Sequence, residues 1–138
     1  DVVGAAAHSH FNLPRKEQTQ RMVRAMENPH VDIIFHLTGR IIHGREPMEV
    51  EIDEIIKTAK RTGTVLEVDA YPVRLDIKDE YIRKCAGAGV KMSIDSDAHS
   101  AAHFKFLEIG IAQARRGWAE KKDIINVWPL DKMLKMLK

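Results

Sequence analysis

The sequence predicts an α/β fold in which parallel strands are covered by outer helices. Short apolar runs alternate with longer segments that carry apolar residues at helical spacing, in the order β-α-β-α-β-α-β-α. The turns on one side of this pattern are short, whereas the loops that follow the strands are long and polar. Such alternation is typical of strand–helix units, in which each helix returns the chain to the start of the next parallel strand.

The strands are predicted from four apolar runs, which span residues 2–7, 31–35, 64–68 and 90–94. The first helix is predicted over residues 15–27, because this proline-free segment places Met22, Val23 and Met26 on one side and Asn28-Pro29 ends it.

The remaining helices follow from apolar residues at helical spacing and from residues that favour helix ends. Gly63 is expected to stop a helix that carries Ile52, Ile55, Ile56 and Ala59. Gly89 is expected to close the next one, with Asp76 as a plausible N-cap. Ser100 can cap a helix whose predicted apolar side holds Phe104, Leu107, Ile111 and Ala114, and Pro129 suits the first turn of a last helix. Residues 123–127 are left without an assignment.

Length and composition predict one soluble domain spanning residues 1–138. The chain is 44% hydrophobic and 30% charged, with a formal charge of +2, which neither favours nor excludes nucleic acid. No apolar run is long enough to span a membrane. Cys85 is the only cysteine, so an internal disulfide is excluded, and its position on an apolar helix side favours a packed thiol. These features fit a cytoplasmic protein.

Histidine or aspartate stands at the end of every predicted strand. The residues are His8 and His10, His36, Asp69, and Asp97 with His99. Active sites of α/β proteins gather at the carboxyl ends of the strands. Imidazole nitrogens and carboxylate oxygens are ligands of divalent metals. The pattern therefore predicts a metal site at this edge, with His10 serving either as a ligand or in the loop.

Two further groups accompany these residues. Glu67 shares side-chain parity with Asp69, which places a carboxylate inside a strand, where it needs a metal, a histidine or an arginine as partner. Arg40 and Arg74 lie in loops at the same edge, and arginine takes phosphate in a bidentate manner. Metals and arginines at one site suggest a phosphoester substrate.

Several segments resemble one branch of the PHP (polymerase and histidinol phosphatase) family, the PHP domain of bacterial and archaeal family X DNA polymerases. The segments are Ser96-Asp97-Ala98-His99-Ser100, His36-Leu37-Thr38-Gly39-Arg40, His8-Ser9-His10-Phe11-Asn12-Leu13, residues 66–76 and Ala114-Arg115-Arg116-Gly117-Trp118. The resemblance runs nearly from end to end. The family's upstream histidine and carboxylate motifs are not found, so we identify the chain as the C-terminal part of such a domain.

The resemblance implies a distorted (β/α)7 barrel that binds up to three metal ions, Mn²⁺ or Zn²⁺. It implies phosphoesterase chemistry on DNA 3′ ends or gapped DNA, in a protein that also carries upstream polymerase and PHP segments. By motif, the metal ligands are His8, His36, Asp97 and His99, whereas Glu67, Asp69 and His10 support them. Arg40 and Arg74 would hold the substrate phosphate.

Asp69 departs from the asparagine usual in that family, and Leu37 from the usual proline. The added carboxylate is expected to strengthen metal binding and weaken phosphate binding. Two alternatives to the phosphoesterase stay open. The first is an incomplete, inactive module that binds metal or DNA. The second is an amidohydrolase-like metal hydrolase, although its carbamoylated lysine or extra histidines cannot be placed.

Overall fold

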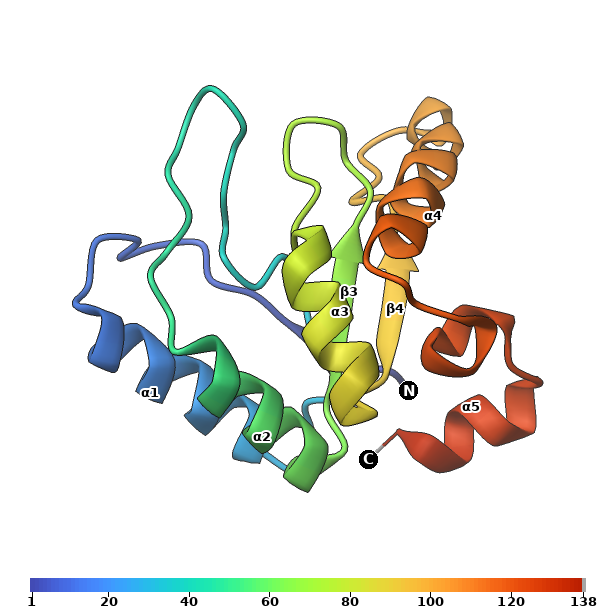
Figure 1. Cartoon of the computed structure of the whole chain (residues 1–138), viewed down its shortest axis with the longest axis horizontal. Coiled ribbons are helices and arrows are strands. Elements are labelled where there is room, and N and C mark those ends of the chain that lie inside the picture. Colours follow the sequence, from blue (N-terminus) through green and yellow to red (C-terminus); the bar gives the residue numbers. More distant parts are fainter. Residues whose placement is uncertain (138) are drawn as a thin grey trace.

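The computed structural model describes residues 1–137 and confirms the parallel α/β arrangement. Four parallel strands form one sheet in the order β1 (Gly4–Ala5), β2 (Ile33–Ile34), β3 (Val65–Asp69) and β4 (Met92–Asp95). The register places Asp69 beside Asp95, so the ends of β3 and β4 are level. Two long loops rise beyond the carboxyl ends of the strands (Figure 1). The four strands form one sheet in the order β1-β2-β3-β4, and closure of a sheet into a barrel stays a prediction.

The first two strands are shorter than the apolar runs that predict them. Side chains and close contacts take the place of longer pairing: the N–H of Val3 donates to Asp32 Oδ2 at 2.7 Å, and Gly4 lies directly against the ring of Phe35. A Cβ on Gly4 would stand 1.9 Å from that ring, so the backbone approaches Phe35 in a way that only glycine allows.

Five α-helices follow in the order α1 (Arg15–Glu27), α2 (Ile52–Thr62), α3 (Asp79–Ala88), α4 (Leu107–Arg116) and α5 (Leu130–Met136). A 3-10 helix, η1 (Ala101–Phe106), leads into α4, and two more, η2 (Lys121–Asp123) and η3 (Ile125–Val127), occupy the segment left unassigned from sequence. Gly63 and Gly89 end α2 and α3 with φ of +73° and +76°, as predicted.

The predicted cap at Asp76 is wrong, because Lys78 holds the N-cap position of α3. Asp76 is fully buried and accepts the backbone N–H of Thr38 at 2.8 Å. Its carboxylate therefore joins the loop after β2 to the loop after β3. These are the two long loops that border the sheet edge.

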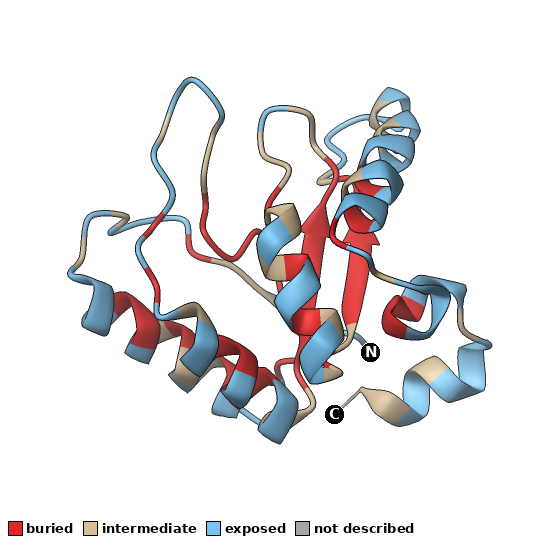
Figure 2. Ribbon diagram, in the orientation of Figure 1, coloured by how far each residue is buried: buried red, intermediate tan, exposed pale blue. Residues whose placement is uncertain are grey.

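The sheet has two unlike faces. Ile34, Leu66 and Met92 belong to the main core beneath the helices, whereas Ile33 and Val65 form a second, smaller cluster with Ile125. Partly buried residues at and beyond the end of η3, among them Trp128 and, in α5, Met133, pack on that smaller cluster. Burial is concentrated in the strands and on the sheet-facing sides of α1 and α2 (Figure 2). Cys85 is buried, and burial raises the pKa of its thiol to about 12, as expected for a packed thiol.

Only part of the apolar side predicted over η1 and α4 packs on the sheet: Ala114 is buried, whereas the larger residues are exposed. Phe104, Leu107 and Ile111 are 61%, 36% and 49% exposed. The helix meets the sheet through Ala114 and through Gly110, where a Cβ would stand 2.6 Å from Ile94. Small residues let the helix approach closely on this side, which turns the larger apolar residues outward (Figure 2).

The outer edge of β4 is occupied by the segment that follows η2. The side-chain amide of Asn126 accepts the N–H of Ile94 at 2.7 Å and donates to its carbonyl at 3.1 Å, and Met92 pairs with Ile124 in an isolated parallel bridge. None of the helices in residues 1–137 is long and apolar enough to cross a membrane.

Candidate active site at the strand ends

A cavity of about 400 Å³ opens at the carboxyl ends of the strands, and we call it the strand-end cavity. It is lined by residues from the end of every strand or the loop that follows it: Ala6, His8, Phe35, His36, Glu67, Asp95, Ser96, Asp97, Ala98 and Phe104. Three of the four predicted metal ligands, His8, His36 and Asp97, therefore line one cavity. The rings of His8 and His36 meet edge to face, with centroids 5.4 Å apart.

His36 is the most constrained of these ligands. It is buried, and its φ of +31° lies in the left-handed region that non-glycine residues seldom adopt. Its backbone N–H donates to Glu67 Oε2 at 2.5 Å, while its Nδ1 is buried without a hydrogen-bond partner. Burial, and then the Arg74 guanidinium, lower the pKa of His36. The imidazole is therefore neutral at neutral pH, the form that can bind a metal.

Glu67 finds a partner that parity did not predict. Its carboxylate accepts the backbone amide of His36, where the sequence suggested a metal or the side chain of a histidine or arginine. Desolvation raises the pKa of Glu67 to about 9; the hydrogen bond from His36 opposes the shift, and Asp69 adds to it. Glu67 is thus protonated at neutral pH and holds the turn that presents His36.

Asp97 and Asp69 share one arginine. Arg74 Nε donates to Asp97 Oδ2 at 3.0 Å and lies 3.5 Å from Asp69 Oδ2. Asp97 has a φ of +46°, again in the left-handed region. Burial raises the pKa of Asp69 to about 7, with the N–H of Tyr71 opposing that shift. The extra carboxylate at position 69 therefore carries only part of its charge at neutral pH.

The fourth predicted ligand and the supporting histidine lie outside the cavity lining. His99 is exposed; its Nδ1 is 2.7 Å from the carbonyl of Asp97, and its N–H donates to His103 Nδ1 at 3.2 Å. His10 is also exposed, with a φ of +55°, and its carbonyl accepts Gln18 Nε2 at 2.6 Å. Because Nδ1 of His99 faces its own loop, Nε2 is the nitrogen left for a ligand.

The residue types suit a metal ion, but the side chains that the structure describes do not lie close enough together to hold one. The unpartnered Nδ1 of buried His36, beside His8 and a carboxylate, is the donor set that Zn²⁺ or Mn²⁺ accepts. However, no three histidine, cysteine, aspartate or glutamate side chains within residues 1–137 come together closely enough to hold an ion. Arg74 supplies the positive charge next to Asp97.

Arg40 lies at the same edge but is committed to the backbone. Its Nε donates to the Arg74 carbonyl at 2.6 Å, and its Nη2 donates to the Leu75 carbonyl. Arg74, by contrast, keeps a buried Nη1 with no hydrogen-bond partner. Of the two predicted phosphate-binding arginines, Arg74 therefore has a spare donor, while Arg40 fixes the loop that carries it.

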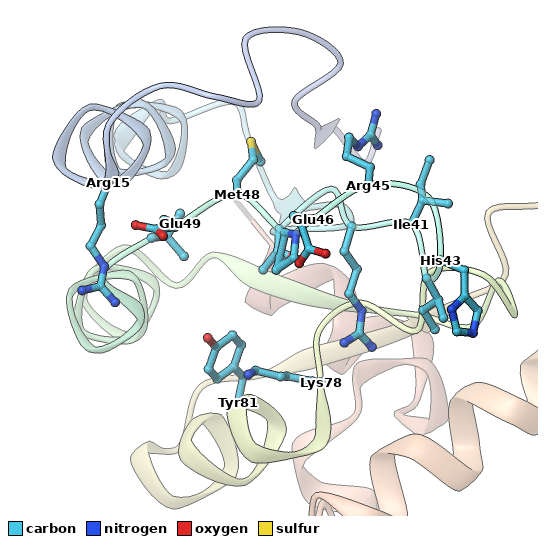
Figure 3. Close-up of a pocket in the computed structure, with 14 residues that line it drawn as sticks. Arg15, Ile41, His43, Arg45, Glu46, Met48, Glu49, Lys78 and Tyr81 are labelled. Atoms are coloured by element: carbon cyan, nitrogen blue, oxygen red, sulfur yellow. The ribbon is translucent and has the colours of Figure 1, made fainter.

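A second cavity, the loop cavity, has a volume of about 440 Å³ and lies along the loop after β2 (Figure 3). Arg15, His43, Glu46, Glu49 and Lys78 contribute charged or polar side chains to its lining, which also includes Thr38, Arg40, Ile41, Ile42, Arg45, Pro47, Met48, Val50 and Tyr81. Arg45 turns away from the cavity in Figure 3, and its guanidinium lies 3.7 Å from the centroid of the Phe11 ring.

Sequence reasoning missed Asp95, Ser96 and Phe104 as lining residues. Asp95 had a usable signal, because it shares parity with Asp97 and lies beside Asp69 in the register. It accepts the hydroxyl of Ser93 at 2.6 Å. Phe104 had no such signal, since its spacing matched the apolar stripe of the following helix.

Comparison with known proteins gives three relatives, and no protein-family model matches the chain. The whole chain aligns with the DNA polymerase/3'-5' exonuclease PolX of Bacillus subtilis at 40% identity over 138 residues, which is 24% of that protein's length. Two probable phosphatases, from Acetivibrio thermocellus and Clostridium novyi, are each 26% identical over 72% of the chain, which covers 42% and 41% of their lengths. The chain thus spans less than half of each of these relatives. The expected resemblance to a family X polymerase protein is confirmed as sequence similarity.

Proposed function

We propose that the chain is the metal-dependent phosphoesterase portion of a PHP domain in a family X polymerase-type protein, acting on DNA 3′ ends. The observation that carries the proposal is His36, a buried neutral histidine with an unpartnered Nδ1 on a cavity shared with His8 and Asp97. Strained backbone at His36 and Asp97 supports the proposal, because such strain gathers at functional sites.

His8, His36 and Asp97 would hold the ion, with His99 as the fourth ligand. The chemistry that a divalent ion such as Mn²⁺ or Zn²⁺ supplies in these sites is activation of a water molecule and neutralisation of charge on phosphoryl oxygens. Glu67 accepts the backbone N–H of His36 and so fixes the turn from which the imidazole would reach an ion.

Arg74 would bind the substrate phosphate through its spare Nη1, while Asp69 and Asp97 orient the guanidinium. Arg40 would then act indirectly, by donating hydrogen bonds to the backbone carbonyls of Arg74 and Leu75. The names of the relatives favour this chemistry, because an exonuclease and a phosphatase both break phosphoester bonds. DNA, and the upstream polymerase and PHP segments of a longer protein, are the proposed partners, in the cytoplasm.

The second candidate is an incomplete site that binds metal or DNA without turnover. One observation favours it: within the described part of the chain, no three ligand side chains converge. Under this alternative the donors of residues 1–137 form one side of a metal cluster, and the other side comes from outside this set.

Elemental analysis after exposure to Mn²⁺ or Zn²⁺, together with hydrolysis of a 3′-labelled oligonucleotide, separates the two. Metal binding with release of the 3′ label, both lost in His36→Ala, supports the phosphoesterase. Metal binding without turnover supports the incomplete site. Absence of both contradicts the metal site itself. His43→Ala is the matched control, because His43 is an exposed histidine on the loop cavity.

A further inference from the structure

Phe104 is an exposed aromatic side chain at the strand-end cavity. It is 61% exposed, while the other phenylalanines, Phe11, Phe35 and Phe106, are partly buried. Phe104 lines the same cavity as His8, His36 and Asp97. An apolar ring that is exposed to water does not contribute the stabilising free energy that its burial would provide. Such a ring is suited to a ligand that brings an apolar face together with a charged group.

The segment that carries Phe104 is held in place through the rings of its neighbours His103 and Phe106. The ring of His103 stacks on Phe106 with centroids 5.1 Å apart, and Tyr71 meets both rings edge to face at 5.4 Å. Residues three apart share one side of a 3-10 helix, which places His103 and Phe106 together against Tyr71. Phe104 lies on another side of η1 and is one of the residues that line the cavity.

We propose that Phe104 is the stacking platform for the base of the terminal nucleotide, which makes the strand-end cavity a nucleotide site rather than a general phosphate site. The cavity volume of about 400 Å³ falls within the range of small-molecule sites, about 300–1,000 Å³. Base stacking on an aromatic side chain contributes about 1–3 kcal/mol per base and tolerates any sequence. The inference rests on the proposed action at DNA ends and adds the feature that distinguishes DNA from small phosphate esters.

The test measures binding without catalysis. Fluorescence anisotropy in a chelator compares a 5′-labelled single-stranded oligonucleotide with the same oligonucleotide carrying an abasic 3′-terminal residue. The chain should bind the complete oligonucleotide about 5- to 150-fold more tightly, the factor that corresponds to one stacked base. Phe104→Ala should abolish this preference, whereas Phe104→Trp should keep it. A 3′-terminal 2-aminopurine should lose emission on binding to the chain and not on binding to Phe104→Ala.

Trp118→Ala is the matched control, because Trp118 is 66% exposed and lies outside the cavity lining, with Arg83 4.1 Å from its ring centroid. Equal weakening of both oligonucleotides by Phe104→Ala would overturn the inference, as would an equal effect of Trp118→Ala or a lack of binding to either oligonucleotide. A change in the molecular mass measured in solution for Phe104→Ala would indicate that the ring lies in a contact between subunits. That result would also overturn the inference. Hydrolysis of a base-free phosphoester, followed separately with Mn²⁺, reports on the proposed phosphoesterase alone.

Discussion

The strand-end cavity and the loop cavity are nearly equal in volume, about 400 and 440 Å³, yet they are built differently. Strand ends fix the first, and its key groups are buried, strained or short of a partner, as in His36. Long exposed side chains such as Arg15, His43 and Glu46 supply the polar groups of the second. The comparison shows that cavity volume does not identify a candidate site. Polar side chains held at fixed positions by the ends of strands do.

The largest difference between the cavities is expected from their histidines. His36→Ala should weaken Mn²⁺ binding by at least about 100-fold, because loss of a group that merely supports a ligand already costs about 10–100-fold. His43→Ala should leave it unchanged. Isothermal titration with Mn²⁺ measures both. Similar losses in the two variants would remove the distinction between the cavities.

A contrast of similar size is expected in the free energy of unfolding from the arginines. Arg74→Ala leaves Asp69, which is fully buried, without its cation, so the free energy of unfolding should fall by about 3 kcal/mol at pH 8. Arg15→Ala, an exposed substitution at the loop cavity, should stay within about 0.5 kcal/mol. Urea unfolding followed by circular dichroism gives both values, and Arg74→Lys should recover only part of the loss.

Stability in a chelator should fall as the pH rises. The folded-state pKa values of Glu67 and Asp69, about 9 and about 7, lie above their ordinary values, so the folded chain keeps protons that the unfolded chain has lost. This stabilisation is complete below about pH 4 and is lost as the pH passes 7 and then 9. Asp69→Asn should flatten the lower part of the profile and Glu67→Gln the upper part. Thermal unfolding measured between about pH 4 and pH 9 tests this dependence. Glu46→Gln, at an exposed residue, is a control that should leave the pH profile unchanged.

The smallest effect is expected from the cations of the loop cavity. Arg15→Ala and Lys78→Ala should each weaken oligonucleotide binding by about threefold or less at 0.15 M salt, because exposed charges act through a screened field. Anisotropy titrations at two salt concentrations give the values. A loss that persists at high salt would instead make the loop cavity a specific phosphate site.

The sequence was informative where local chemistry decides the structure. Left-handed backbone at the ends of α2 and α3 requires glycine, so Gly63 and Gly89 located both ends correctly. Histidine and aspartate at the ends of parallel strands correctly predicted one shared edge, and His8, His36 and Asp97 do line one cavity.

Contacts between distant segments could not be read in the same way. Parity placed Glu67 inside a strand, but its partner, the amide of His36, lies 31 residues away and carries no side-chain signature. The apolar stripe predicted over η1 and α4 implied burial of Phe104, whereas the close approach at Gly110 decided which side faces the sheet. Sequence periodicity predicts the apolar side of a helix, but tertiary packing determines which residues of that side are buried.

Asn126 has a consequence for how the protein behaves among its own copies. A parallel sheet that ends at an exposed strand offers a row of unpaired amides to any other chain, which is a common route to aggregation. At Ile94 both backbone groups on this side are already bonded to the amide of Asn126, which imitates one peptide unit of a further strand. A neighbouring molecule would have to displace that side chain, and the bridge at Ile124 next to it, before it could extend the sheet at β4.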